Sequence, residues 1–139
     1  MSRRGSSMVE FALVAPVLLL LLAGVLNFGV ALRTAIAVSQ AARAGAQYAA
    51  SSVANSSDVS GIAAATRNAA PAVSGIEAAT TRYCKCASGS AVACTAACSS
   101  GPVEMYVTVN ASATAPVWFR YAGLGYTGAV AGGTTMRVR

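Results

Sequence analysis

Histidine is absent from this chain of 139 residues, and the acidic residues number only four. The absence of histidine removes the commonest general base and the commonest metal ligand, and it excludes a Ser-His-Asp triad despite the many serines. Asp58, Glu77 and Glu104 are too isolated in the sequence to indicate a paired-carboxylate site. We therefore expect a protein that is not an enzyme, with no catalytic residues and no cofactor.

Charged residues of either sign are scarce, at 10% of the chain against about 25% in typical soluble domains. Hydrophobic residues make up 55%, and the mean hydropathy is +0.58. The net charge is +6, but the basic side chains are scattered singly from Arg33 to Arg139, with no basic stripe and no nucleic-acid-binding motif. This composition is not that of an ordinary cytosolic protein, and we expect no nucleic acid among its partners.

One long apolar run dominates the N-terminal part of the chain. Phe11 to Leu32, FALVAPVLLLLLAGVLNFGVAL, is a stretch of 22 residues without a charge. The hydrocarbon core of a bilayer is about 30 Å thick and needs about 20 helical residues, so the run predicts a single transmembrane helix. Asn27 is its only strongly polar side chain, and we expect it to face a partner or to lie near the far interface of the bilayer.

Basic residues on the two sides of this run bear on its orientation. Arg3 and Arg4 precede it, and basic residues beside the first span stay in the cytoplasm. Arg33 and Arg43 lie beyond its other end and weaken the rule, but a cytoplasmic N-terminus places the cysteines where they oxidise. A cleaved secretory signal has a shorter apolar region of about 7–15 residues. The arginine pair also occurs in twin-arginine export signals, but the rest of such a signal is missing.

The helix is predicted to continue far beyond the membrane, from about Ser7 to about Val53, because no proline interrupts it before Asn55. At 1.5 Å per residue it would be roughly 70 Å long, half in lipid and half outside. Small apolar residues recur every three or four positions in the outer half, and this thin stripe should pack on the rest of the protein. The stripe comprises Ala35, Val38, Ala42, Ala46, Ala49 and Val53.

The remaining sequence predicts an α+β fold. A short second helix is expected within residues 58–70, capped by Asp58 or Ser60 and ended by Pro71. β-Branched, aromatic and alternating residues then predict a small antiparallel sheet, and residues 119–133 are interpreted as a glycine-rich loop. The strands are expected near Ala79–Cys86, Val103–Ala113 and Thr134–Val138.

Four cysteines lie close together as C-x-C, seven further residues and C-x-x-x-C. An even number of cysteines in a short exported chain predicts disulfides. Cys84 and Cys86 share one face of a strand, which favours nested pairs, Cys86–Cys94 inside Cys84–Cys98, with the other two connectivities left open. C-x-C fits a zinc site poorly, so we expect no metal. A neighbouring lysine lowers the pKa of a thiol, so Lys85 between two cysteines leaves a reactive thiol pair as a further alternative.

Aromatic residues make up only 6% of the chain, yet three of them gather in the stretch PVWFRY. Core packing against the long helix is the favoured interpretation of Trp118, Phe119 and Tyr121. The alternative is contact with a partner or with the membrane interface, where amphipathic aromatic rings collect.

The start of the chain carries a recognisable motif, made of Gly5, Glu10 and the span that begins at Phe11. The stretch RRGSSMVEFALVAPVLLLLLAGV resembles TadE-like minor pilins of the tight-adherence (Tad, or Flp) pilus system, which are similar to type IV pilins and pseudopilins. Such proteins have a short basic leader, a glycine, VEFALV-P-LLLL and a small periplasmic domain. Phe11 stands where the related major Flp pilins carry tyrosine. The resemblance covers about the first third of the chain.

The resemblance implies that a prepilin peptidase of the inner membrane cuts after Gly5 and makes Ser6 the new N-terminus. Glu10 then becomes the fifth residue of the mature chain. An ionised carboxylate in lipid is costly, and the resemblance implies that Glu10 pairs with the Ser6 amine of a neighbouring subunit. Ser7 and Glu10 also match an S-x-x-E capping box, an ordinary helix start that is compatible with the same role.

We therefore expect a leader over 1–5, a transmembrane half-helix over 6–32, a periplasmic half-helix over 33–54 and a small periplasmic or extracellular α+β domain over 55–139. The resemblance implies a minor pilin or pseudopilin, held in the bacterial inner membrane and assembled into, or priming, a Tad pilus for surface adhesion. Its implied partners are the prepilin peptidase, other pilin subunits, the inner-membrane assembly platform and the lipid bilayer.

Three alternatives stay open. One is a single-pass, membrane-anchored binding or sensor domain that never enters a filament, and another is a thiol-redox or metal-binding membrane protein. The third is a type II secretion pseudopilin, which usually has phenylalanine just after the cut, where this chain has Ser6.

Overall fold

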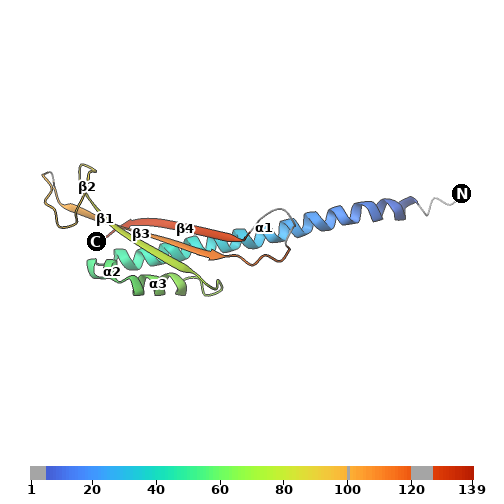
Figure 1. Ribbon diagram of the computed structural model, residues 1–139, viewed down its shortest axis with the longest axis horizontal. Coiled ribbons are helices and arrows are strands. Elements are labelled where there is room, and N and C mark those ends of the chain that lie inside the picture. The colour runs from blue at the N-terminus through green and yellow to red at the C-terminus, as the bar shows by residue number, and fades with distance from the viewer. Residues whose placement is uncertain (1–5, 100, 120–126) are drawn as a thin grey trace.

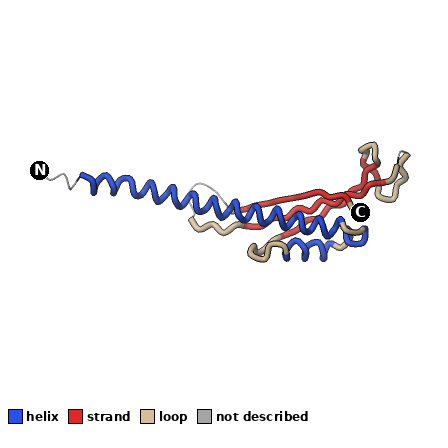
Figure 2. Tube along the Cα trace, turned by 180° about the vertical axis from the view of Figure 1, so that it is seen from behind, coloured by secondary structure: helices blue, strands red, loops and turns tan. Residues whose placement is uncertain are grey.

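The computed structural model describes residues 6–99, 101–119 and 127–139. The described residues form one long helix, two short helices and an antiparallel sheet, which confirms the expected α+β class. Figure 1 shows that the N-terminal half of α1 (Ser6–Ala50) projects away from the rest of the chain, whereas its C-terminal half lies along the sheet. The rear view in Figure 2 shows the helices together on one side of the strands.

Helix α1 closely follows the predicted long helix. It runs for 45 residues, and Pro16 lies inside it without ending it. The expected end near Val53 is three residues too late, because Ser52 leaves the helical conformation and becomes the N-cap of the next helix. Its side chain accepts a hydrogen bond from the N–H of Asn55. The resulting short helix, α2 (Val53–Ser57), is not predicted by the sequence.

Helix α3 (Val59–Asn68) is the predicted short helix, and Asp58 is its N-cap. The carboxylate of Asp58 accepts hydrogen bonds from the N–H of Gly61 and from the hydroxyl of Tyr48 on α1, each at 2.9 Å. Hydrogen bonds from the Ser60 hydroxyl, the Gly61 N–H and the Tyr48 hydroxyl lower the pKa of Asp58. The cap therefore also fixes α3 to α1.

The sheet has the strand order β2-β1-β3-β4, and all the neighbouring strands are antiparallel. Two predicted strands are confirmed with slightly wider bounds, and the third begins five residues earlier than predicted. The shortest strand is not predicted by the sequence. The strands are β1 (Glu77–Cys86), β2 (Ala91–Val92), β3 (Val103–Thr114) and β4 (Ala129–Arg137).

Gly132 and Gly133 explain why the sequence predicts a loop for the first half of β4. A Cβ on Gly132 would come within 2.5 Å of the hydroxyl oxygen and 2.8 Å of the Cα of Ser39 on α1, and a Cβ on Gly133 would collide with the side-chain oxygen of Asn110. Glycine is needed here because a helix and a neighbouring side chain approach the strand closely. The interpretation of residues 129–133 as loop is therefore wrong.

The core forms where the small-residue stripe of α1 meets the inner face of the sheet. Most of the predicted stripe is fully buried. Val107 and Val109 of β3 face it, and Ile62 of α3 completes this part of the core. Because α1 presents mainly alanine, the sheet lies close to the helix backbone. The buried members of the predicted stripe are Val38, Ala42, Ala46 and Ala49, and Ala41 beside them is also buried. Val53 does not belong to the stripe, because it lies in α2 and is 57% exposed.

All four cysteines are paired, as predicted, but the favoured nested pairing is wrong. The disulfides join Cys84 to Cys94 and Cys86 to Cys98, with Cα–Cα distances of 5.1 and 5.7 Å. Each pair therefore interleaves with the other along the sequence. No free cysteine is found among the described residues, which leaves no thiol for the reactive-pair alternative.

The register of the β1–β2 hairpin explains the interleaved pairing. Cys84 lies opposite Val92, so the chain has already passed the level of Cys86 when it reaches Cys94. A second turn, closed by the hydrogen bond from the Ala96 N–H to the Ala93 carbonyl at 2.9 Å, then begins a new change of direction. The following residues bring Cys98 beside Cys86. Nested pairing would have needed one wide turn in place of these two.

Candidate membrane and assembly helix

The projecting half of α1 is mostly uncovered in the part of the chain that the structure describes. Large apolar side chains are exposed all round it from Met8 to Leu32. Its most apolar 18-residue window has a mean hydropathy of 2.6, and none of that window is buried. By length and composition this helix could span a membrane, as the sequence predicts. An uncovered apolar surface of this size needs lipid or other helices around it.

The predicted processing and assembly residues lie at the far N-terminal end of this helix. Gly5 falls outside the described residues. Ser6 is the first residue of α1 as described, and Glu10 and Phe11 follow within the next two turns. Both are exposed, Phe11 to 70%. Ser7 lies inside the helix, which does not fit its interpretation as the N-cap of a capping box.

The structure does not bring the predicted site residues together. Glu10 and Phe11 lie near the projecting N-terminal end of α1, whereas Cys84 and Cys86 lie at the end of β1 beside β2, at the opposite end of the molecule (Figure 1). The two regions therefore serve different purposes. The first presents a surface, and the second cross-links the distal end of the sheet.

Asn27 has a partner within the chain, which the sequence did not identify. Its side-chain oxygen accepts hydrogen bonds from the N–H groups of Trp118 and Phe119 at 3.1 and 3.3 Å, and its amide nitrogen donates to the carbonyl of Phe119 at 2.7 Å. A single amide side chain thus binds three backbone groups of the segment that follows β3. The feature of the sequence that indicated a partner for Asn27 was its position as the one strongly polar residue in an apolar run.

The aromatic residues of this segment are not core residues. Trp118 is 68% exposed and Phe119 is 45% exposed, so the favoured prediction of core packing is wrong for both. Asn27 holds their backbone beside α1 and leaves their rings outside the core. Tyr121, the third predicted member of the cluster, lies outside the described residues.

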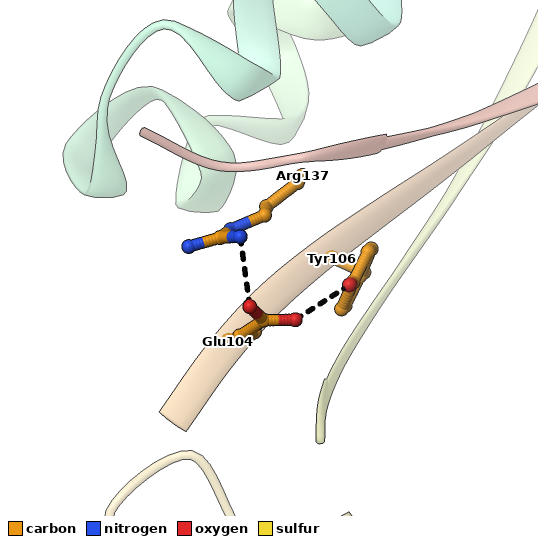
Figure 3. Close-up of polar contacts among 3 residues, drawn as sticks. All are labelled: Glu104, Tyr106 and Arg137. Carbon is orange, nitrogen blue, oxygen red and sulfur yellow. Dashed lines mark hydrogen bonds and ion pairs between the residues drawn. The ribbon is translucent and has the colours of Figure 1, made fainter. Parts of the chain in front are cut away.

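The outer face of the sheet carries the clearest polar cluster (Figure 3). Glu104 accepts a hydrogen bond from the Tyr106 hydroxyl at 2.8 Å and forms an ion pair with Arg137 at 2.7 Å. The hydrogen bond to Glu104 raises the pKa of Tyr106. The Tyr106 ring stacks on Tyr83, with ring centroids 5.5 Å apart. These contacts tie β1, β3 and β4 together, and they match no arrangement for acid–base or nucleophilic catalysis.

No group of three or more potential metal-binding side chains is found within the described part of the chain. Fold and site together define a protein with a membrane-length N-terminal helix that carries a small, disulfide-bonded α+β domain.

Comparison with known proteins makes this class more specific. The family model for TadE-like proteins matches residues 5–47, which include Gly5, Glu10, Asn27 and most of α1. This match confirms the resemblance over the N-terminal helix. Neither the curated proteins nor the solved structures give a significant match to the chain.

Proposed function

We propose that this protein is a minor pilin or pseudopilin that enters, or primes, a Tad pilus for surface adhesion. Before assembly it is held in the inner membrane by residues 6–32, with its N-terminus in the cytoplasm and residues 33–139 in the periplasm. A prepilin peptidase removes residues 1–5 by cutting after Gly5. The inner-membrane assembly platform then transfers the subunit from lipid to the growing filament and so to the cell surface.

The observation that carries this proposal is the uncovered apolar half of α1, in the segment that matches TadE-like proteins. A helix that is apolar on every side satisfies its surface equally well in lipid or in a bundle of identical helices. The same surface therefore serves both as a membrane anchor and as a filament core. The core of the domain packs on the other half of α1, so the large apolar side chains of the projecting half stay exposed for this contact.

Glu10 supplies the specific part of the assembly contact. A charged side chain in an apolar surrounding is costly unless it is paired. Cutting after Gly5 creates a positively charged amine on Ser6, within reach of the Glu10 carboxylate of a neighbouring subunit. Pairing the two charges favours the filament over isolated subunits and fixes the axial position of each subunit. Phe11 lies next to this pair and contributes apolar contact.

The test compares membrane insertion with filament incorporation for Glu10→Val. Insertion should be normal because the helix becomes more apolar, whereas the chain recovered in sheared pili should fall at least about tenfold, since one charge is left unpaired in an apolar surrounding. Leu21→Val, a change in the exposed part of the same helix, is the matched control and should retain wild-type incorporation. Wild-type levels of Glu10→Val in pili would refute the charge-pair role. Absence of the wild-type chain from pili would favour the membrane-anchored binding or sensor domain.

A further inference from the structure

We propose that Trp118 and Phe119 anchor the domain in the outer lipid interface of the membrane that α1 spans, and that Asn27 fixes the depth of this anchor. The ligand is the lipid surface itself, at the boundary between acyl chains and headgroups. The inference rests on one part of the proposed function, the insertion of α1 into a bilayer. It does not depend on cutting by the peptidase or on entry into a filament.

Asn27 provides hydrogen-bond partners for the backbone of the segment that carries the two rings. Non-helical backbone is tolerated at membrane depth only where its polar groups have partners, because lipid offers none. The Asn27 amide binds the N–H groups of Trp118 and Phe119 and the carbonyl of Phe119. These bonds give partners to three backbone groups that a short loop would otherwise expose to the hydrocarbon region. The same bonds explain why an asparagine occurs in an otherwise apolar span.

The position of Asn27 along α1 sets the depth of this segment in the membrane. Asn27 follows Glu10 by 17 positions, or about 25 Å at 1.5 Å per residue. With Glu10 at the inner edge of a hydrocarbon core about 30 Å thick, Asn27 lies just inside the outer edge. Arg33 lies about 9 Å further along α1 and therefore reaches the headgroup layer. The segment that Asn27 holds is thus at the level of the interface.

The exposed side chains near Asn27 are of the kinds that are found at membrane interfaces. Tryptophan is enriched at membrane interfaces because its ring is amphipathic, and basic side chains at this level contact lipid phosphates. Trp118 and Arg33 line the same open groove, of about 800 Å³, between α1 and the segment that follows β3. Figure 1 shows this segment extending along α1 beyond the end of the sheet, toward the projecting half. The exposed rings therefore continue the apolar surface of the span.

The chain contains a single tryptophan, so its fluorescence reports on Trp118 alone. The full chain is reconstituted into vesicles of phosphatidylcholine and phosphatidylglycerol, with bromine placed either near the headgroup end or near the methyl end of the acyl chains. Carbonate extraction first establishes that α1 is inserted. We expect strong quenching by the shallow bromine and weaker quenching by the deep bromine.

Asn27→Leu removes the three hydrogen bonds but keeps the span apolar. We expect it to lower quenching by the shallow bromine by at least about twofold, because the unpaired backbone leaves the apolar layer. Asn68→Ala, an exposed change at the end of α3, is the matched control and should quench as the wild type does.

Two results would overturn the anchor and a third would overturn the role of Asn27 in it, and all three leave the proposed function intact. In the first, Trp118 of the inserted chain is unquenched by lipid and accessible to aqueous acrylamide, so it lies in water. In the second, it is inaccessible to both quenchers, so a protein surface covers it. In the third, Asn27→Leu quenches as the wild type does, which refutes the role of Asn27. A wild-type chain that fails to insert overturns the proposed function and the anchor together.

Discussion

The interleaved disulfides allow a prediction that separates this structure from the nested pairing that the spacing favours. In Cys84→Ser, the free thiol should appear on Cys94, because Cys86 and Cys98 remain joined. The nested pairing would instead leave the free thiol on Cys98. Alkylation of the denatured, unreduced protein, followed by peptide mass analysis, locates the thiol.

The size of the effect on stability follows from the loops that the bridges close. The bridged residues are 10 and 12 positions apart, and on the chain-entropy model loops of this length are worth about 2.5–3 kcal/mol each. The pairs interleave, so either bridge shortens the loop that the other closes. We therefore expect the free energy of unfolding to fall by about 2.5 kcal/mol on loss of one bridge and by about 5 kcal/mol on loss of both.

Urea unfolding of the full chain in detergent micelles measures these differences. The variant with Cys84 and Cys94 both changed to serine should contain no free thiol and should match the single-bridge value. Changing Cys84 and Cys98 together is the matched control, because it breaks both bridges and should cost about twice as much. Equal stability of the two double variants, or a free thiol on Cys98 in Cys84→Ser, would refute the interleaved pairing.

Two further predictions concern the folded domain. Ile62→Ala should lower the free energy of unfolding by about 2–5 kcal/mol, because the side chain is fully buried against α1 and β3. Val59→Ala, at an exposed site on the same helix, is the control and should change the free energy of unfolding by no more than about 0.5 kcal/mol. Equal losses in the two variants would contradict this core. The Ser60 and Tyr48 hydroxyls help to lower the pKa of Asp58 below its ordinary value of 3.8. The wild type should therefore lose stability as the pH falls below that value, whereas Asp58→Asn should lose less. Parallel pH profiles of thermal unfolding for the two proteins would show that this carboxylate contributes nothing to stability.

The sequence predicts best where one physical requirement dominates the pattern. The run from Phe11 to Leu32 must avoid charge if it is to lie in lipid, and the alanines after it must recur every three or four positions if one side of the helix is to be buried. The uncharged run and the recurring alanines can both be identified from the sequence alone, and both are present in α1. Asp58 was predictable as a cap for the same reason, since its side chain acts on its own neighbours.

Prediction failed where a residue's role depends on distant partners. Gly132 looks like a loop residue until Ser39 is seen against it. The bridge between Cys84 and Cys94 depends on a hairpin register that spacing does not encode. Trp118 has a large aromatic side chain, which is typical of a core residue. Its backbone N–H donates a hydrogen bond to Asn27, 91 positions away, and this bond explains why the ring lies outside the core.

The central claim is that the chain is a processed pilin subunit, and the mass of its N-terminal peptide tests this most directly. The protein is purified from the membranes of a host with an active prepilin peptidase, beside the variant Gly5→Val, in which the added side chain crowds the bond to be cut. We expect a wild-type chain that begins at Ser6 and a variant that retains its leader. A wild-type chain that begins at Met1 or Ser2 in that host would contradict it.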